Sequence, residues 1–175
     1  SNSVRDVYEW SFFEQINKRF IRGKYNYLFM TSKPVLVRES ILVDQEIETI
    51  NECLEISGKL LVNNEYIEPE YIQSMKEKVE KHPYTTYLPG AGVAIPHGMS
   101  EGFKFIKQTG ISILQIPSGV DWLGEKVYIV IAIAANSEEH MNVLASLGDA
   151  LESEEDAKRL WETNSIEKIY NLLSQ

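Results

Sequence analysis

The first part of the chain shows apolar positions at helical spacing. Apolar residues recur every three or four positions over residues 4–20, which predicts an amphipathic helix. Its apolar face is expected to contain Val4, Tyr8, Phe12, Phe13, Ile16 and Phe20. Gly23 ends the pattern, and Pro34 marks a boundary after an irregular aromatic stretch. We therefore expect residues 1–36 to form a helical and aromatic extension that packs on the main body or on a second subunit.

From about residue 37 the pattern becomes regular and predicts two helices. The first spans about residues 45–62, with Asp44 as its N-cap. The second runs from about Pro69, a residue suited to a first helical position, to about Lys81.

Three later segments are predicted to be strands: residues 93–95, 110–116 and 127–135. Pro, Ser and Gly at residues 117–119 are expected to turn the chain after the second of them. The third segment is β-branched and almost wholly apolar, which is typical of a central strand covered on both faces.

The C-terminal part of the chain predicts helices again, over residues 137–151, 154–162 and 165–173. Because helices and strands alternate, the fold class is expected to be α/β, a three-layer-like domain with a mixed central sheet flanked by helices. This domain is expected to span residues 37–175.

Charge and cysteine content narrow the classes of partner and compartment. The chain has 17 Lys and Arg against 26 Asp and Glu, a formal charge of −9, so no direct nucleic-acid partner is expected. The longest apolar run, residues 127–135, is too short to span a membrane, and no membrane insertion is expected. The single cysteine, Cys53, fits a helix packing position and a reducing compartment such as the cytoplasm.

His97 lies at a chemically suggestive place, directly after a predicted strand and between Pro96 and Gly98. Pro96 restricts the backbone before it, and Gly98 has no side chain to block a phosphoryl group or a partner's backbone. These are the requirements of a nucleophilic histidine that meets a second protein.

His140 is the second candidate, in the first turn of the helix after the central strand. Asn136 with Glu139, or Ser137 alone, is expected to cap this helix. The helix dipole disfavours an imidazolium there, so His140 is expected to be neutral and to donate a hydrogen bond to an anion.

The residues alone also allow ordinary roles for the two histidines. Either one can be a surface or core residue, and the pair with Glu138 or Glu139 can form a metal site, although the i, i+4 spacing of zinc helices is absent. The chain has no dinucleotide-binding glycine motif, no phosphate-binding P-loop and no Gly-x-Ser-x-Gly motif.

Residues 92–98, Gly-Val-Ala-Ile-Pro-His-Gly, closely resemble the active-site signature of the mannitol/fructose class of phosphotransferase-system EIIA domains. Further stretches agree with this family in order and spacing, over about residues 37–174: residues 66–75, 119–122, 127–135 and 139–144. The resemblance is closest to mannitol-type sequences. It implies a phosphohistidine carrier that needs no metal or nucleotide cofactor.

The resemblance also implies roles for individual residues and partners. His97 would accept a phosphoryl group from the carrier HPr and pass it to a sugar-specific EIIB domain, and His140 would hydrogen-bond that group. The family has an Arg on the second helix near the active histidine, and Lys78 takes its place here. A lysine is a flexible point charge without the planar fork of arginine, so it should hold the group less tightly.

Two functions fit this resemblance. The first is a transport phosphocarrier for mannitol, another polyol or fructose. The second is an EIIA-like regulatory domain of a transcription activator, phosphorylated on the same histidine. The carrier is preferred, and a homodimer is also considered.

Overall fold

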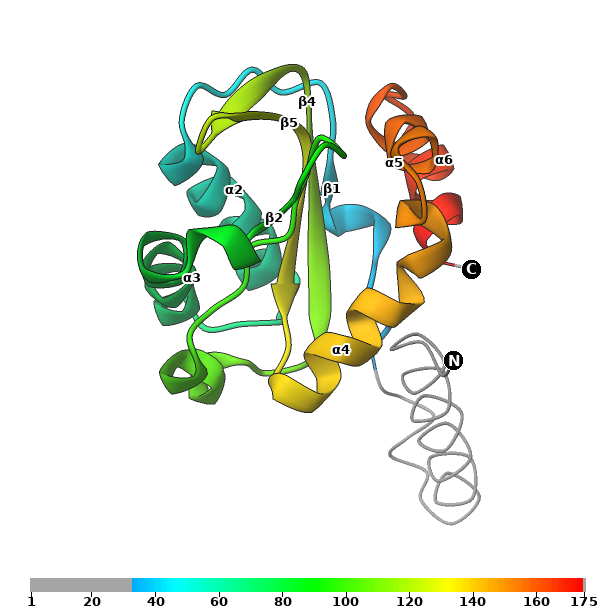
Figure 1. Ribbon diagram of the computed structural model, residues 1–175. Coiled ribbons are helices and arrows are strands. Elements are labelled where there is room, and N and C mark those ends of the chain that lie inside the picture. The colour runs from blue at the N-terminus through cyan, green and yellow to red at the C-terminus, as the bar shows by residue number, and fades with distance from the viewer. Residues whose placement is uncertain (1–32, 175) are drawn as a thin grey trace, which may run out of the picture.

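The computed structural model describes residues 33–174, which form one mixed five-stranded sheet between two layers of helices (Figure 1). The strand order is β1-β4-β5-β3-β2, where β1–β4 and β3–β5 are parallel pairs and β4–β5 and β2–β3 are antiparallel. The strands are β1 (Ile41–Leu42), β2 (Tyr87–Leu88), β3 (Val93–Ala94), β4 (Gly110–Trp122) and β5 (Glu125–Ala134). The predicted α/β class is confirmed.

Helices cover the two faces of the sheet separately. α2 (Ile50–Asn63) and α3 (Glu70–Lys81) lie on one face, and α4 (Ser137–Ser146), α5 (Glu154–Trp161) and α6 (Ile166–Leu173) lie on the other (Figure 1). Short 3-10 turns connect these elements: η2 (Arg38–Ser40), η3 (Pro83–Thr85), η4 (Ser100–Phe105) and η5 (Gly148–Leu151).

The central strand β5 explains why its sequence is an unbroken apolar run. Alternate side chains point to opposite faces of a strand. Val130 and Ala132 pack into the core under α2 and α3, whereas Ile131 and Ile133 pack into the core under α4, α5 and α6. Both faces are buried, so the sequence shows no polar alternation.

The predicted start of the first helix is wrong. α2 begins at Ile50, and its N-cap is Thr49, whose side-chain oxygen accepts a hydrogen bond from the Glu52 N–H at 3.2 Å. Asp44 instead adopts a left-handed conformation, with φ of 58°, in the turn after β1. Its N–H donates to the Gln115 side chain, so this segment lies beside β4 and the helix begins later.

The turn predicted at residues 117–119 is also wrong, because β4 continues through it. The register with β5 shifts between Gln115 and Val120, and Gly119 has φ of 77°. An irregularity of this kind bends a strand without ending it.

The long helix predicted over residues 137–151 is divided in two. α4 ends at Ser146, and the chain tightens into η5 from Gly148. The other two C-terminal helices are confirmed, and α3 begins one residue after Pro69.

Cys53 is fully buried in α2, and burial raises the pKa of its thiol to about 12. It is a packing residue, as predicted. None of the helices within residues 33–174 is long and apolar enough to cross a membrane. The helix predicted for residues 4–20 lies outside the described residues.

Candidate active site

His97 lies at the end of β3, beside the end of the central strand. β3 runs parallel to β5, and the pairing continues one step further, where the Ile133 N–H donates to the Pro96 carbonyl at 2.9 Å. The rigid Pro96 therefore belongs to the sheet. It fixes the backbone from which His97 projects.

His140 reaches the same place from the neighbouring strand. β5 ends at Ala134, and α4 begins directly after Asn136, whose side-chain oxygen accepts from the Glu139 N–H at 2.9 Å. Of the two predicted caps, the structure therefore has Asn136 and not Ser137. The carboxyl ends of parallel neighbouring strands meet at one edge of a sheet, so both histidines stand at that edge.

The two imidazole rings converge. Their centroids lie 4.4 Å apart with an angle of 48° between the ring planes. Both side chains are half-buried. A phosphoryl group bonded to one ring would therefore have the other ring as a close neighbour.

The backbone fixes which nitrogen of His97 is available for chemistry. Nδ1 lies 2.9 Å from the carbonyl oxygen of Ile95. A carbonyl oxygen only accepts hydrogen bonds, so Nδ1 holds the proton. In the neutral ring Nε2 then has the free electron pair.

Both histidines are neutral at neutral pH. Burial lowers the pKa of His97 below its ordinary value. The hydrogen bond to Ile95 raises this pKa in part, and the nearby charge of Lys78 lowers it further. For His140, burial is again the main cause, followed by His97 and Lys78, and together they lower its pKa to about 4. A neutral His140 was expected from the helix dipole, whereas burial and neighbouring charge are the causes here.

Lys78 brings a positive charge to the two rings. It lies in the last turn of α3, half-buried, and its charge lowers the pKa of both histidines. The two histidine rings therefore meet, and Lys78 is near enough for its charge to act on both. A phosphoryl-binding role for Lys78 stays a prediction.

Tyr71 and Ser74 of α3 position the chain after His97, a role that was not predicted for either residue. The Gly98 N–H donates to the Tyr71 hydroxyl at 2.8 Å, and this hydroxyl donates to the Ile133 carbonyl at 2.8 Å. The Met99 N–H donates to the Ser74 hydroxyl at 2.8 Å. Tyr71, Ser74 and Lys78 follow i, i+3, i+7 spacing on one helix face, a signal that was visible in the sequence.

The expected reason for Gly98 needs correction. We expected its missing side chain to leave room for a phosphoryl group or partner. A Cβ at this position would instead lie 2.6 Å from a Tyr71 ring carbon and 2.8 Å from the Ser74 hydroxyl. Gly98 is buried against α3, so glycine is required by packing.

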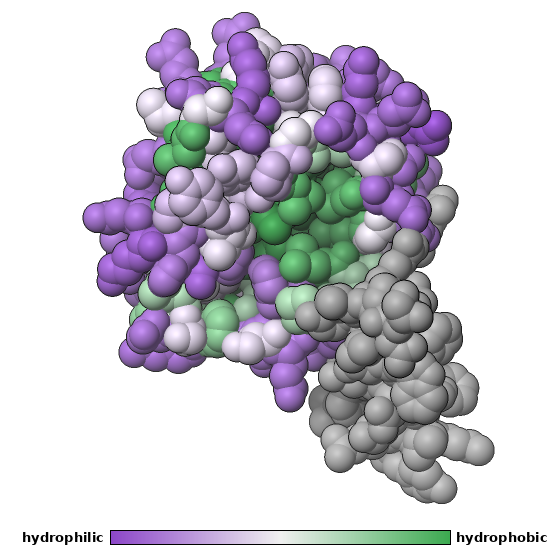
Figure 2. Space-filling view, in the orientation of Figure 1, coloured by the Kyte–Doolittle hydropathy of each residue, from purple (hydrophilic) through white to green (hydrophobic). Residues whose placement is uncertain are grey.

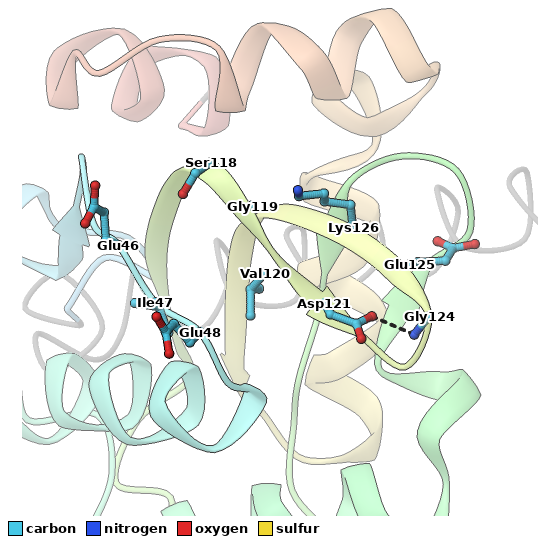
Figure 3. Close-up of a pocket in the computed structure, with 10 residues that line it drawn as sticks. All are labelled: Glu46, Ile47, Glu48, Ser118, Gly119, Val120, Asp121, Gly124, Glu125 and Lys126. Carbon is cyan, nitrogen blue, oxygen red and sulfur yellow. Dashed lines mark hydrogen bonds between the residues drawn. The ribbon is translucent and has the colours of Figure 1, made fainter.

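A pocket of about 510 Å³ lies at the opposite end of β5, around the β4–β5 hairpin (Figure 3). Its charged lining is mostly acidic, with Glu46, Glu48, Asp121 and Glu125 against Lys126. This charge disfavours a phosphoryl group. Within residues 33–174, no group of three or more His, Cys, Asp or Glu side chains is placed to hold a metal ion.

Comparison with known proteins assigns the chain and its fold to a family. The family described as phosphoenolpyruvate-dependent sugar phosphotransferase system, EIIA 2, matches residues 34–175. The chain belongs to this family. The resemblance seen in the sequence is therefore confirmed, and the chain is an EIIA-type component, a phosphoryl carrier of the phosphotransferase system.

Individual relatives of this EIIA chain are mannitol-specific. The mannitol-specific phosphotransferase enzyme IIA component of Geobacillus stearothermophilus is 34% identical over 145 residues, which cover 82% of this chain and 98% of the relative. The protein of the same name from Staphylococcus aureus is 34% identical over 137 residues, which cover 78% of this chain and 93% of the relative.

Solved structures agree. The crystal structure of IIA mannitol from Escherichia coli matches with a TM-score of 0.71 and 36% identity, over 79% of this chain and 98% of that one. IIAMTL in its complex with phosphorylated IIBMTL, also from Escherichia coli, matches with a TM-score of 0.72 and 35% identity, over 79% and 96% of the two chains. These relatives do not favour the alternative of a regulatory domain.

Proposed function

We propose that this EIIA chain accepts a phosphoryl group on Nε2 of His97 from phosphorylated HPr and transfers it to a sugar-specific EIIB domain. The Nε2 electron pair attacks phosphorus while the bond from phosphorus to the donor nitrogen breaks, and that electron pair returns to the donor imidazole. The observation that supports this most directly is the Nδ1–H···O=C contact to Ile95, because it leaves Nε2 unprotonated and oriented.

His140 and Lys78 would stabilise the transferred group. Phosphoryl transfer makes small covalent demands on a protein, so positioning and charge provide most of the catalysis. A neutral His140 can donate an N–H to one equatorial oxygen, and Lys78 supplies a positive charge near the pair. His140 stays neutral because of its low pKa, so the positive charge at the site comes from Lys78.

The substrate and partner assignments rest on relatives. Because the matched relatives are mannitol-specific and one was solved with a phosphorylated IIB partner, we assign mannitol, or a similar polyol or fructose, and an EIIB partner. HPr as donor, a cytoplasmic location and a homodimer stay predictions. The division into an extension at residues 1–36 and a phosphocarrier domain at 37–175 is also proposed, supported by the family match from residue 34.

Mass spectrometry of the full chain after incubation with phosphorylated HPr tests the proposal. The chain should gain one phosphoryl group, His97→Ala should gain none, and His82→Ala should behave like the parent chain because His82 is an exposed residue after α3. Adding a mannitol-type EIIB should then remove the label. Undiminished labelling of His97→Ala would refute the assignment, and label that EIIB never removes would refute the transport role.

A further inference from the structure

A hydrophobic hollow opens beside the central sheet, between the strands and the α4–η5 segment (Figure 2). Partly buried hydrophobic side chains on the elements around it pack against the core beneath α4, α5 and α6. They include Leu88 of β2, Leu144 of α4, and Ala150 and Leu151 of η5. The helix break after Ser146, between α4 and η5, lies on this side of the sheet.

The chain itself contains a segment with the matching chemistry. Residues 4–20 form an amphipathic pattern, and at 3.6 residues per turn Tyr8, Phe12 and Ile16 fall on one stripe. As a helix this segment would be roughly 25 Å long. Exposed aromatic stripes of this size are unfavourable in water, so the segment needs an apolar partner surface.

The connecting chain is long enough to reach the hollow. Residues 21–32 separate the amphipathic segment from the described part and, fully extended, span up to about 40 Å. Val35 is tied to the sheet, because its carbonyl accepts from the Ile111 N–H at 2.9 Å. Ile111 pairs with Ile133 near the end of β5, so the extension leaves the sheet close to where α4 begins.

The charges of the two surfaces are complementary. Residues 1–32 contain five Lys or Arg and three Asp or Glu, which gives them a net charge of +2. The whole chain has a net charge of −9, so the remaining residues have a net charge of −11. Four of the five basic residues lie within residues 18–24. Five acidic residues lie in η5, in the link after it and in the first turn of α5, and we call them the acidic rim: Asp149, Glu152, Glu154, Glu155 and Asp156.

We propose that residues 4–20 of this same chain dock as a helix in the hollow beside α4 and η5, with the basic residues of 18–24 facing the acidic rim of η5 and α5. The same surface borders α4, the helix that contains His140. The docked segment would therefore stand next to the site without contributing a reacting group. The inference does not depend on phosphoryl transfer.

A nitroxide spin label on the full chain tests the docking. Ser11→Cys places the label off the apolar stripe, and the native Cys53 does not compete because it is fully buried. We expect the amide signals of α4, η5 and β2 to broaden and those of α2 to stay sharp. Adding Phe12→Glu should abolish the broadening, whereas the matched control Asn17→Glu, which adds the same charge off the stripe, should retain it.

A variant in the hollow and a mixing experiment complete the test. Ala150→Glu should release the segment, and an otherwise unchanged amide spectrum shows that the fold persists. Broadening must also persist on dilution and be absent when nitroxide-labelled chains are mixed with isotope-labelled chains that lack nitroxide. Uniform broadening, broadening that survives Phe12→Glu, or broadening that appears only between two copies would each overturn the proposal.

Discussion

Replacing Tyr71 with phenylalanine removes one hydroxyl that joins three elements. In the protein this hydroxyl accepts from Gly98 N–H and donates to the Ile133 carbonyl, both at 2.8 Å and both buried. Burial also raises the pKa of Tyr71 to about 12, so the hydroxyl keeps its proton. Each of the two backbone groups left without a partner costs about 1–3 kcal/mol, so Tyr71→Phe should lower the free energy of unfolding by about 2–6 kcal/mol.

Urea denaturation of the variant measures this loss, and Tyr66→Phe is a matched control. Tyr66 is also fully buried, but its hydroxyl contacts a single acceptor, the carbonyl of Pro34, away from the site. The control should lose about 1 kcal/mol. Tyr71→Phe should also accept phosphoryl groups more slowly, because the backbone after His97 loses one of its two anchors and keeps only the contact to Ser74. Equal stability losses in the two variants with unchanged labelling by Tyr71→Phe would refute the reasoning.

Three further predictions concern the neighbouring residues. Gly98→Ala should destabilise the protein by about 1–3 kcal/mol in the same assay, because its Cβ would contact the Tyr71 ring at 2.6 Å, and wild-type stability would contradict this. His140, with a pKa of about 4 when folded and 6.5 when unfolded, stays neutral while the unfolded chain gains a proton. The free energy of unfolding should therefore fall as the pH is lowered from about 6.5 to 4, and the loss should reach about 2 kcal/mol at pH 5. The loss should be smaller in His140→Gln, and an equal dependence on pH in the two proteins would contradict this prediction. Lys78→Met should raise the pKa of His97 in an NMR titration, and Lys78→Arg should leave it unchanged; an unmoved pKa in Lys78→Met would show that its charge is not felt.

The sequence predicted those elements whose pattern is local. β5 was recognisable because both of its faces are buried, and α5 and α6 because their apolar stripes are regular. The start of α2 was misplaced because Asp44 is held by the Gln115 side chain, 71 residues away. No local signal distinguishes such a residue from a helix cap, since both place a short polar side chain before an apolar run.

The two histidines of the candidate site were also predicted from the sequence, but the contacts that position them were not. The positions of His97 and His140 followed from motif and strand order, and their rings meet as expected. The Tyr71 contact was missed because it depends on how α3 packs against the ends of two strands. For the same reason Gly98 was given a role in access, when the ring of Tyr71 occupies that space.

The outermost strands of the sheet, β1 and β2, are two residues long each. Strands this short have few unpaired main-chain groups of their own to offer an incoming peptide, which is one way proteins limit edge-to-edge aggregation and the recruitment of an additional strand. Partner proteins of this carrier would therefore be recognised by side-chain shape and charge around the histidines. Recognition through side chains, without main-chain pairing, is compatible with a carrier that must release each partner.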